Sequence, residues 1–366
     1  MVNRMIMENV LHRPVRTLVS ILAVAIEVGM VLLVVGMTTG LLEDSKRRVG
    51  GIGADVLVQP PGASYIFSFT SAPMPIKFGE KLAEVPHVLA VAPVLFNVHI
   101  SGGINVVYGI DMRSFDRVTG GFAYHEGGPL TGPDDILVDD WFAKANHLRV
   151  GKTLRLLNHD FRVAGVVEHG KGARLFIPID TAQERLGAHD KASIFFVKCT
   201  DPGYTEDVVA SLHNLLPAYQ ILSIQEYMSL MTSNNLPAFN AFVTTLIAVA
   251  VGIGFLVIFL SMYTTITERT REIGILKSLG ASKGYIIEVI LREAGLLSAI
   301  GIVAGFVGTF IAMKVIQAYF PTLPIELTGT WELRATLLAI AGSLLGAFYP
   351  ALRAAQLDPL DALAYE

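Results

Sequence analysis

Cysteine and charge are both scarce in this sequence of 366 residues. The single cysteine, Cys199, excludes an internal disulfide framework and any cysteine-based metal site. Charged residues make up only 16% of the chain and the formal net charge is −4, so the protein offers no basic surface for nucleic acid. Hydrophobic residues reach 52%, which is typical of a membrane protein that also carries a sizeable polar part.

Complete catalytic and nucleotide-binding motifs are also missing. Residues 280–284 match the G-x-S-x-G pattern, but an amphipathic helical segment precedes them where a hydrolase needs a buried strand, and no histidine follows His213. Gly151, Lys152 and Thr153 match the end of a P-loop, but Asn146 stands at the position of its first glycine. The sequence therefore predicts no catalytic site, no metal site and no cofactor on this chain, so ATP and Mg²⁺ would bind a partner.

Four long apolar runs occur, at residues 18–42, 238–265, 294–319 and 333–352. Each is long enough for a membrane-spanning helix, which needs about 20 residues. The first run exceeds the apolar core of a signal peptide, and no A-x-A cleavage site follows it, so we expect it to stay in the protein. The predicted fold class is a membrane protein with four transmembrane α-helices (1 + 3). A large α+β domain, residues 43–237, lies between the first and second helices.

Lysine and arginine in the short loops predict the orientation. A cytoplasmic N-terminus, residues 1–17, gives that side Arg4, Arg13 and Arg16 together with the basic residues of segment 266–293, whereas the outer loop 320–332 has no basic residue. Basic residues at 46–48 oppose this arrangement, but the sum over four spans favours it. Both termini, including the tail 353–366, are then cytoplasmic, and the large domain is extracytoplasmic.

The large domain shows the patterns of mixed α+β structure. Alternating apolar residues predict strands at 55–59, 88–100, 105–110, 136–138, 153–157, 161–167 and 194–199. Residues 158–160 are typical of a hairpin turn, and residues 206–216 of an amphipathic helix. Residues 120–133 are rich in glycine and turn residues, so the sequence predicts no strand there.

Segment 266–293 has the composition of a helix, a sharp turn and a second helix. Charged residues fill much of this segment, and apolar residues recur near helical spacing at Ile266, Ile273, Leu276 and Leu279. Gly280 is placed to end the first helix and Ser282 to cap the second. A charged elbow of this kind suits docking of a soluble partner, although a solvated loop with snorkelling side chains fits the same chemistry.

Residues 268–282, their continuation 286–293 and the tail 349–363 resemble the MacB/FtsX/LolC-type permeases of ABC transporters. In that family the elbow is a coupling helix gripped by a cytoplasmic ATPase, and stalks carry the motion outward (mechanotransmission). The resemblance implies that Ile275, Leu276 and Leu279 pack under the membrane. It implies ATPase coupling for Glu272, Ile273, Gly274, Lys277, Gly280, Ala281 and Ser282.

The resemblance further implies a non-catalytic permease subunit in the bacterial inner membrane, of the stand-alone kind without a fused ATPase. Its cargo for export or extraction would be a lipoprotein, glycolipid, peptide or drug. Implied partners are a cytoplasmic ABC ATPase, a second permease copy or paralogue, membrane lipid, and a periplasmic adaptor with an outer-membrane factor. A β-rich lobe at about 115–192 and a helical stalk at 223–237 are also implied. An FtsX-like signalling subunit that activates a cell-wall hydrolase remains an alternative, as does a membrane-anchored enzyme.

The last candidate functional residues are polar and small residues inside the predicted membrane spans. Glu27 is tolerable in the first span, because an apolar gain of roughly 4–8 kcal/mol exceeds a cost of about 2.5–3.5 kcal/mol. We expect it to face protein or water, on Thr244, Thr245 or Ser261, with a lone protonated or snorkelling side chain as the alternative. Small-residue pairs predict close helix crossings, within one chain or between two, at Gly36 and Gly40, Gly301 and Gly305, and Gly342 and Gly346.

Overall fold

The computed structural model describes residues 14–62, 74–100, 104–231 and 237–358. The chain divides into a helical unit, Met1–Gly40, Pro237–Tyr319 and Ile325–Glu366, and a sheet unit, Leu41–Leu236 and Phe320–Pro324. Three predicted features lie outside the described residues. They are the N-terminal arginines at 4 and 13, the stalk at 232–236 and the tail beyond 358.

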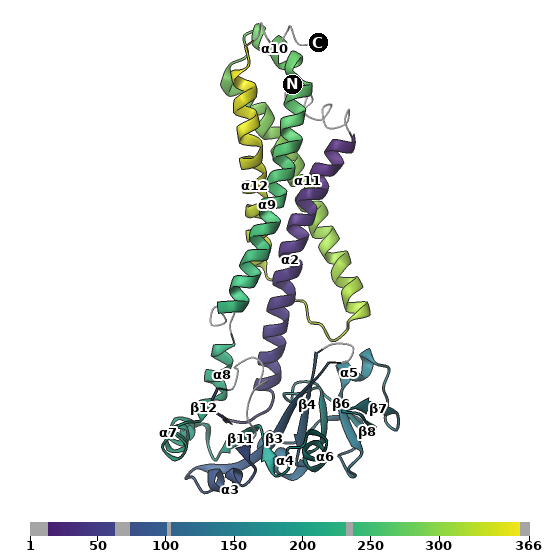
Figure 1. The fold of residues 1–366 in the computed structure, drawn as a ribbon, viewed down its shortest axis with the longest axis vertical. Coiled ribbons are helices and arrows are strands. Elements are labelled where there is room, and N and C mark those ends of the chain that lie inside the picture. Colours follow the sequence, from purple (N-terminus) through teal and green to yellow (C-terminus); the bar gives the residue numbers. More distant parts are fainter. Residues whose placement is uncertain (1–13, 63–73, 101–103, 232–236, 359–366) are drawn as a thin grey trace. The chain divides into compact units, whose positions relative to one another are not determined.

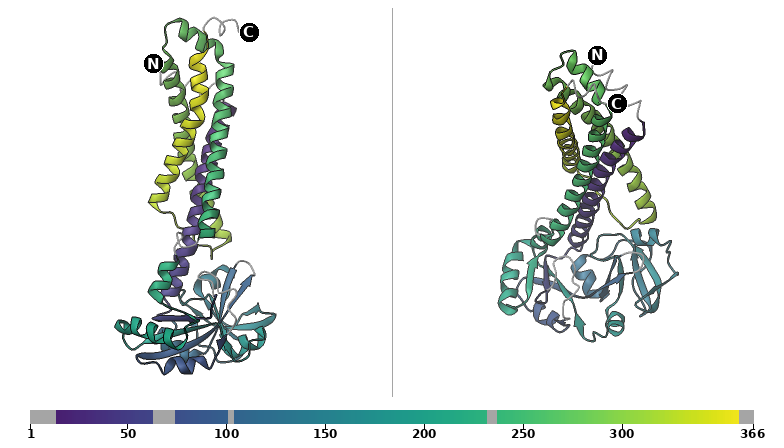
Figure 2. Two further views of the ribbon diagram at one scale, coloured as in Figure 1. Left: turned by 60° about the vertical axis from the view of Figure 1, so that its left-hand side comes forward. Right: turned by 45° about the horizontal axis from the view of Figure 1, so that its top comes forward.

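Four long helices build the helical unit. They are α2 (Pro14–Gly50), α9 (Pro237–Glu268), α11 (Lys283–Tyr319) and α12 (Gly329–Gln356), and α10 (Thr270–Ser278) follows α9. All four are long and apolar enough to cross a membrane, as the sequence predicts. They run side by side in Figure 1 and in both views of Figure 2.

The helices extend beyond the apolar runs, because polar residues at a helix end keep their backbone hydrogen bonds while their side chains reach solvent. Helix α2 continues through the basic residues 46–48 to Gly50, and its last ten residues belong to the sheet unit. Helix α11 begins at Lys283, so the second half of the predicted elbow is the start of the third long helix. Only α10 is a separate elbow helix.

Small residues set the packing of the bundle. A side-chain carbon added at Gly301 of α11 would lie 2.6 Å from Cβ of Val24 and 3.0 Å from the carbonyl oxygen of Ile21, both on α2. Ala339, Ala347 and other small residues of α12 are fully buried in the same core. At these small residues the helix backbones therefore approach each other closely, and the helices do not pack through large interlocking side chains.

We expect Gly301→Val to lower the midpoint temperature for unfolding of the purified permease, because the added atoms overlap the backbone and side chains of α2. Overpacking of this kind costs about 1–3 kcal/mol or more. Gly308→Val in the same helix is the matched control, since an added Cβ there meets nothing within 4 Å. Equal unfolding temperatures for the two variants would contradict the crossing.

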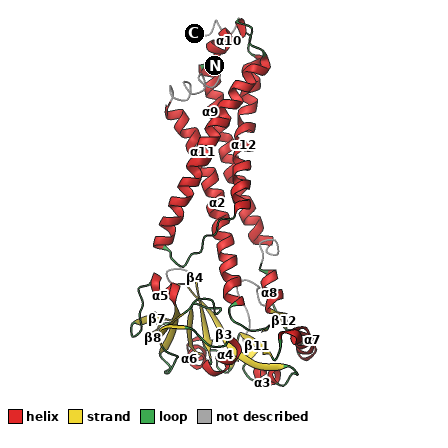
Figure 3. Cartoon of the chain, turned by 180° about the vertical axis from the view of Figure 1, so that it is seen from behind, coloured by secondary structure: helices red, strands yellow, loops and turns green. Residues whose placement is uncertain are grey.

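The sheet unit is built on a ten-stranded sheet in the order β12-β1-β11-β3-β4-β9-β6-β8-β5, with β7 paired to β8. Its strands are drawn in yellow in Figure 3. The predicted strands are present as β1 (Val56–Gln59), β3 (Val88–Ile100), β4 (Ile104–Ile110), β6 (Asp135–Asp139), β7 (Thr153–Leu156), β8 (His159–Val167) and β11 (Ile194–Cys199). The strands β5 (Tyr124–Gly127), β9 (Leu175–Pro178) and β12 (Gln220–Ser223) were not predicted. A small second sheet pairs β2 (Met74–Pro75) with β10 (Lys191–Ala192).

Short helices connect the strands. They are α3 (Phe78–Ala83), α4 (Met112–Thr119), α5 (Asp140–Ala145), α6 (Ile179–Leu186), the 3-10 turn η1 (Pro202–Tyr204), α7 (Thr205–Leu215) and α8 (Ile224–Leu230). Helix α7 corresponds to the helix predicted at 206–216, and α8 lies within the predicted helical stalk. Asp111 and Asp139 cap α4 and α5 by accepting hydrogen bonds from the backbone N–H groups of Ser114 and Phe142.

The β-rich lobe expected at about 115–192 is not separate in the structure. Its strands have their own apolar core around Phe161, Ile136 and Ile177. Parallel pairing of β4 with β9, however, joins these strands to the rest of the sheet, with Tyr108 opposite Phe176. Hydrogen bonding across this junction makes one continuous sheet, and the two halves form a single compact unit.

Candidate coupling site

The elbow consists of α10 and the turn to α11. Helix α10 ends at Ser278, and Gly280 adopts a positive φ of 95°, which suits glycine after a helix end. The hydroxyl of Ser282 accepts a hydrogen bond of 3.2 Å from the backbone N–H of Tyr285, so it caps α11. The turn chemistry expected from the sequence is therefore present.

The buried face of α10 differs from the expected one. Ile273 is only 8% exposed and joins the bundle core, and Gly274 is buried beside it, so neither can be gripped by another protein in this conformation. Ile275 is 46% exposed and Leu279 is 81% exposed, so neither packs against the helices of this chain, and their packing under the membrane stays a prediction. Only Leu276 of those three packs against the core.

The remaining coupling candidates also fall into two groups, those that contact other parts of this chain and those that are exposed. Lys277 donates hydrogen bonds to the backbone carbonyl oxygens of Ala355 and Leu357, so its ammonium group is used within the chain. Ala281 packs against the bundle core. Glu272, Gly280 and Ser282 are exposed. The accessible surface of the elbow therefore consists of Arg271, Glu272, Ile275, Ser278, Leu279, Gly280, Ser282, Lys283 and Gly284.

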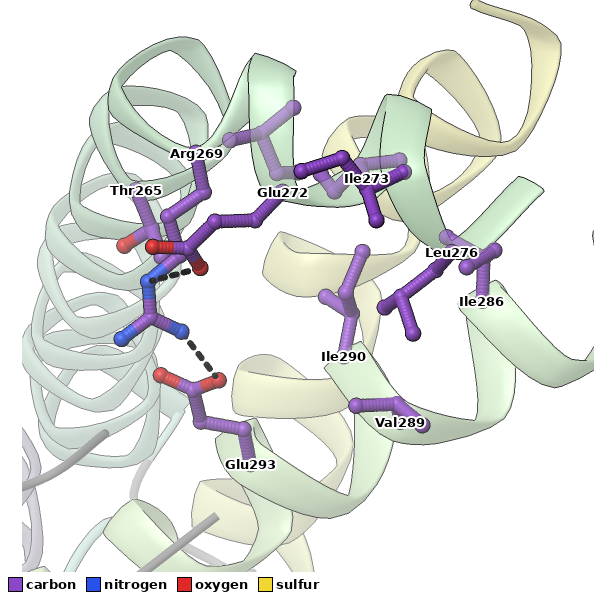
Figure 4. A pocket seen from close by; sticks show the side chains of 11 residues that line it. Thr265, Arg269, Glu272, Ile273, Leu276, Ile286, Val289, Ile290 and Glu293 are labelled. Atoms are coloured by element: carbon purple, nitrogen blue, oxygen red, sulfur yellow. Dashed lines mark hydrogen bonds and ion pairs between the residues drawn. The ribbon is translucent and has the colours of Figure 1, made fainter. Parts of the chain in front are cut away.

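A pocket of about 310 Å³ lies between α9, α10 and α11 (Figure 4). Its walls are mostly apolar, and they include Ile273, Leu276 and Ile290. Arg269 lies at one side, where its guanidinium is 3.5 Å from Glu293 and 3.9 Å from Glu272. These ion pairs tie the start of the elbow to α11, so α9, α10 and α11 form one connected structure at this end of the bundle.

Glu27 is buried in the bundle, with 3% of its surface exposed. Neither carboxylate oxygen has a hydrogen-bond partner among the described residues. The side chain lies against Gly254 of α9, where an added Cβ would be 1.9 Å from one carboxylate oxygen. The polar partners proposed from the sequence lie elsewhere, since Ser261 pairs with Ser20 at 2.6 Å and Thr244 and Thr245 are exposed. Glycine, rather than a polar side chain, accommodates the acid.

The small-residue pairs lie mainly against other parts of the same chain. Gly305 lies against Val28 of α2, one turn beyond the contact of Gly301. Gly346 lies against the backbone of Phe255 in α9, and Gly342 lies near Glu27 and Val251. Gly36 faces Ile325 and Leu327 in the segment before α12, and Gly40 is buried.

A buried charge cluster in the sheet unit was not predicted. Arg174, which is 5% exposed, contacts Asp44 at 3.3 Å, Asp139 at 3.5 Å and the backbone carbonyl oxygen of Thr322 at 3.1 Å. Arg48 pairs with Asp44 at 3.2 Å. The cluster thus joins the end of α2, strand β6, the start of β9 and the segment Phe320–Pro324.

The charged groups of this cluster are buried in an environment of low dielectric constant. Burial raises the pKa of Asp139 to about 6, against the opposing attraction of Arg174 and the hydrogen bond from the backbone N–H of Phe142. The guanidinium of Arg174 also lies 5.6 Å from the ring centre of Trp141. Because the partners of Arg174 lie 35, 130 and 148 residues away along the chain, no local sequence pattern predicts the cluster.

Four apolar helices, an elbow between the second and third, and a sheet unit between the first and second are the architecture of a multi-pass membrane protein. Residues 17–215 match the MacB-like periplasmic core domain, and residues 244–359 match the FtsX-like permease C-terminal domain. The chain belongs to the MacB/FtsX family of ABC transporter permeases. The predicted fold class is thereby confirmed.

Individual relatives agree with this assignment. The chain is 28% identical to the macrolide export ATP-binding/permease protein MacB of Marinobacter nauticus, over 96% of this chain and 58% of the relative. It is 25% identical to the ABC transporter permease YknZ of Bacillus subtilis, over 99% of this chain and 98% of the relative. The chain therefore spans about three-fifths of the length of the MacB relatives that it matches.

Among solved structures, the chain is similar to the periplasmic region of MacB from Actinobacillus actinomycetemcomitans. The TM-score is 0.38 at 20% identity, over 48% of this chain and 92% of that one.

Proposed function

We propose that this chain transmits ATP-driven motion from a cytoplasmic ABC ATPase, through the elbow, to the sheet unit on the other side of the bacterial inner membrane. Both termini and α10 lie in the cytoplasm in this proposal. Membership of the ABC permease family supports the general role. The chemical work is done by the ATPase, and this chain contributes position and mechanical connection.

One observation carries the proposal. Ile275 of α10 and Leu279, the residue that follows α10, are exposed four positions apart. Their neighbours Ser278, Gly280, Ser282 and Lys283 are polar or small and also exposed. The polar neighbours make it unfavourable for this surface to lie in lipid. The two large apolar side chains make it unfavourable for the same surface to be exposed to water. A protein partner with an apolar groove satisfies both, and the adjacent Glu272 and Arg271 supply a polar rim.

The continuity of α2 supports this transmission of motion. Helix α2 is continuous from Pro14 to Gly50, and its last turns enter the charge cluster through Asp44 and Arg48. A continuous helix transmits displacement along its axis, and a buried ion cluster resists local slippage. Motion of the helical unit would therefore reach β6 and β9 through α2.

The wider assembly follows by analogy with relatives. MacB relatives are named for macrolide export, and we infer export or extraction of a lipoprotein, glycolipid, peptide or drug for this chain. Two permease copies, or a copy and a paralogue, would form the transporter with two ATPase subunits. A periplasmic adaptor and an outer-membrane factor would complete the export route in a two-membrane cell.

Topology labelling with affinity purification tests the proposal. In a Cys199→Ala background, a cysteine at Ser282 should be shielded from an impermeant maleimide in intact spheroplasts, and a cysteine at Arg155 should react. Purification of the full chain from its own host should retain an ABC ATPase. Labelling of both cysteines on the same side, or a complex that never contains an ATPase, would overturn the proposal. A cell-wall hydrolase retained on the outer unit would favour the signalling role.

A further inference from the structure

Most of the accessible surface inside the pocket between α9, α10 and α11 is apolar. Figure 4 shows Ile273, Leu276 and Ile290 pointing into the same space from two of these helices. Ile273 and Ile290 keep 8–9% of their surface accessible, and Leu276 is half-buried. The volume of about 310 Å³ lies within the usual range of small-molecule sites, about 300–1,000 Å³. The pocket can therefore hold a short apolar body.

Three charged side chains gather at one side of this pocket (Figure 4). The guanidinium of Arg269 lies between two carboxylates, 3.5 Å from Glu293 and 3.9 Å from Glu272. The side chain of Glu293 is 6% exposed, whereas that of Glu272 is 70% exposed and stands at the mouth of the pocket. Because the contact with Glu272 is long and open to solvent, Arg269 neutralises this carboxylate only in part. The mouth therefore keeps an acceptor for a cation.

The other basic side chains of α10 do not line the pocket. Arg271 is exposed outside it, and the ammonium group of Lys277 donates to backbone carbonyl oxygens near the end of α12. An anionic ligand would have to separate Arg269 from a carboxylate that it already contacts. A cationic ligand, in contrast, gives Glu272 a second partner. Charge complementarity therefore favours a cation in this pocket.

We propose that the pocket binds a small hydrophobic cation, a protonated amine on a short apolar body. The ammonium group donates to the carboxylate of Glu272, and the apolar body packs against Leu276 and Ile290. This site goes beyond the proposed function, because its occupancy requires no ATPase. Under the proposed function an occupant would also change the surface of the elbow, since Ile275 and Glu272 belong both to the pocket and to that surface.

The test photo-labels the full chain in maltoside micelles. The probe is a hexylammonium that carries a diazirine in its alkyl chain, and mass spectrometry of the peptides locates the labelled residues. Hexylammonium, butylammonium, hexanol and hexanoate are titrated as competitors. The unfolding temperature of each variant is measured alongside, so that a loss of labelling is compared only between folded proteins.

Two pairs of variants separate the pocket from the micelle. Glu272→Gln removes the carboxylate at the mouth, and Glu288→Gln makes the same change at an exposed position of α11 outside the pocket. Leu276→Trp fills the pocket, and Leu279→Trp makes the same change at an exposed position outside it. Because the Glu272 side chain is mostly exposed, Glu272→Gln should fold as the parent does.

Labelling by the probe should be saturable and lie within residues 265–293. Hexylammonium should compete about tenfold or more better than butylammonium, because it buries two more methylene groups. Glu272→Gln should weaken hexylammonium binding about threefold or more, and Leu276→Trp about tenfold or more. Both control variants should bind it as the parent does.

Equal competition by hexanol or hexanoate would overturn the cation as the ligand. Saturable labelling only outside residues 265–293, or equal labelling of Leu276→Trp and Leu279→Trp, would overturn the site. ATPase coupling is not measured, so failure here leaves the proposed function standing.

Discussion

Replacing Leu279 by aspartate is expected to raise the permease concentration needed to stimulate the partner ATPase about 30-fold or more, while the permease still folds and inserts. The side chain is 81% exposed, so its loss removes little packing within this chain. If it is an apolar anchor in the ATPase groove, burying a carboxylate there should cost 2 kcal/mol or more, which weakens binding about 30-fold. The measurement is ATP hydrolysis by the reconstituted complex as permease concentration rises.

Leu89→Asp is the matched control for this experiment. Leu89 is 62% exposed on β3 of the sheet unit, so it receives the same substitution on a surface that the proposal assigns to the other side of the membrane. Leu279→Met should keep most of the stimulation, because methionine preserves the apolar contact. If Leu279→Asp stimulates hydrolysis as well as Leu89→Asp does, the elbow surface is not the ATPase contact.

Replacing Arg174 by methionine is expected to destabilise the sheet unit by about 3 kcal/mol or more. The guanidinium is the common partner of Asp44 and Asp139, and removing one member of a buried ion cluster leaves uncompensated charge in a low-dielectric site. The carbonyl oxygen of Thr322 loses its side-chain donor as well. The free energy of unfolding, followed by denaturant titration of the purified chain, measures the effect.

Two further variants separate charge burial from simple loss of packing. Arg174→Met combined with Asp139→Asn should recover much of the loss, because Asp44 keeps Arg48 as its partner and no unpaired buried carboxylate remains. Lys198→Met is the control, since the Lys198–Asp55 pair is partly exposed and should contribute about 1 kcal/mol or less. Equal destabilisation by Arg174→Met and Lys198→Met would show that the cluster has no special role.

Local signals in the sequence predicted the four long helices, the turn after α10 and seven of the strands, but not β5, β9 and β12. Four apolar runs predicted the four long helices, and alternation predicted strands such as β3 and β11. Gly280 and Ser282 predicted the sharp turn after α10, because helix ends depend on neighbouring residues only. Strand β5 was missed because its residues are exposed and follow a glycine-rich stretch, so they show no apolar alternation.

The functional surfaces depend on contacts between distant residues, and the sequence could not supply them. The face that α10 buries is decided by its neighbours α9 and α11, and this places Ile273 in the bundle core instead of on the accessible surface. Lys277 was a reasonable candidate for a partner contact, but carbonyl groups about 80 residues further on accept its hydrogen bonds. Arg174 reaches a partner 130 residues away in α2, which no local pattern records.

The central claim is that force received at α10 reaches the sheet unit. The most direct measurement is amide hydrogen exchange of the permease–ATPase complex, with and without ATP and vanadate, over residues 41–50, 135–145 and 172–178. The account predicts changed exchange in these segments on nucleotide trapping, and no change in the Leu279→Asp complex. Unchanged exchange throughout the sheet unit, in a complex that hydrolyses ATP at its normal stimulated rate, would contradict it.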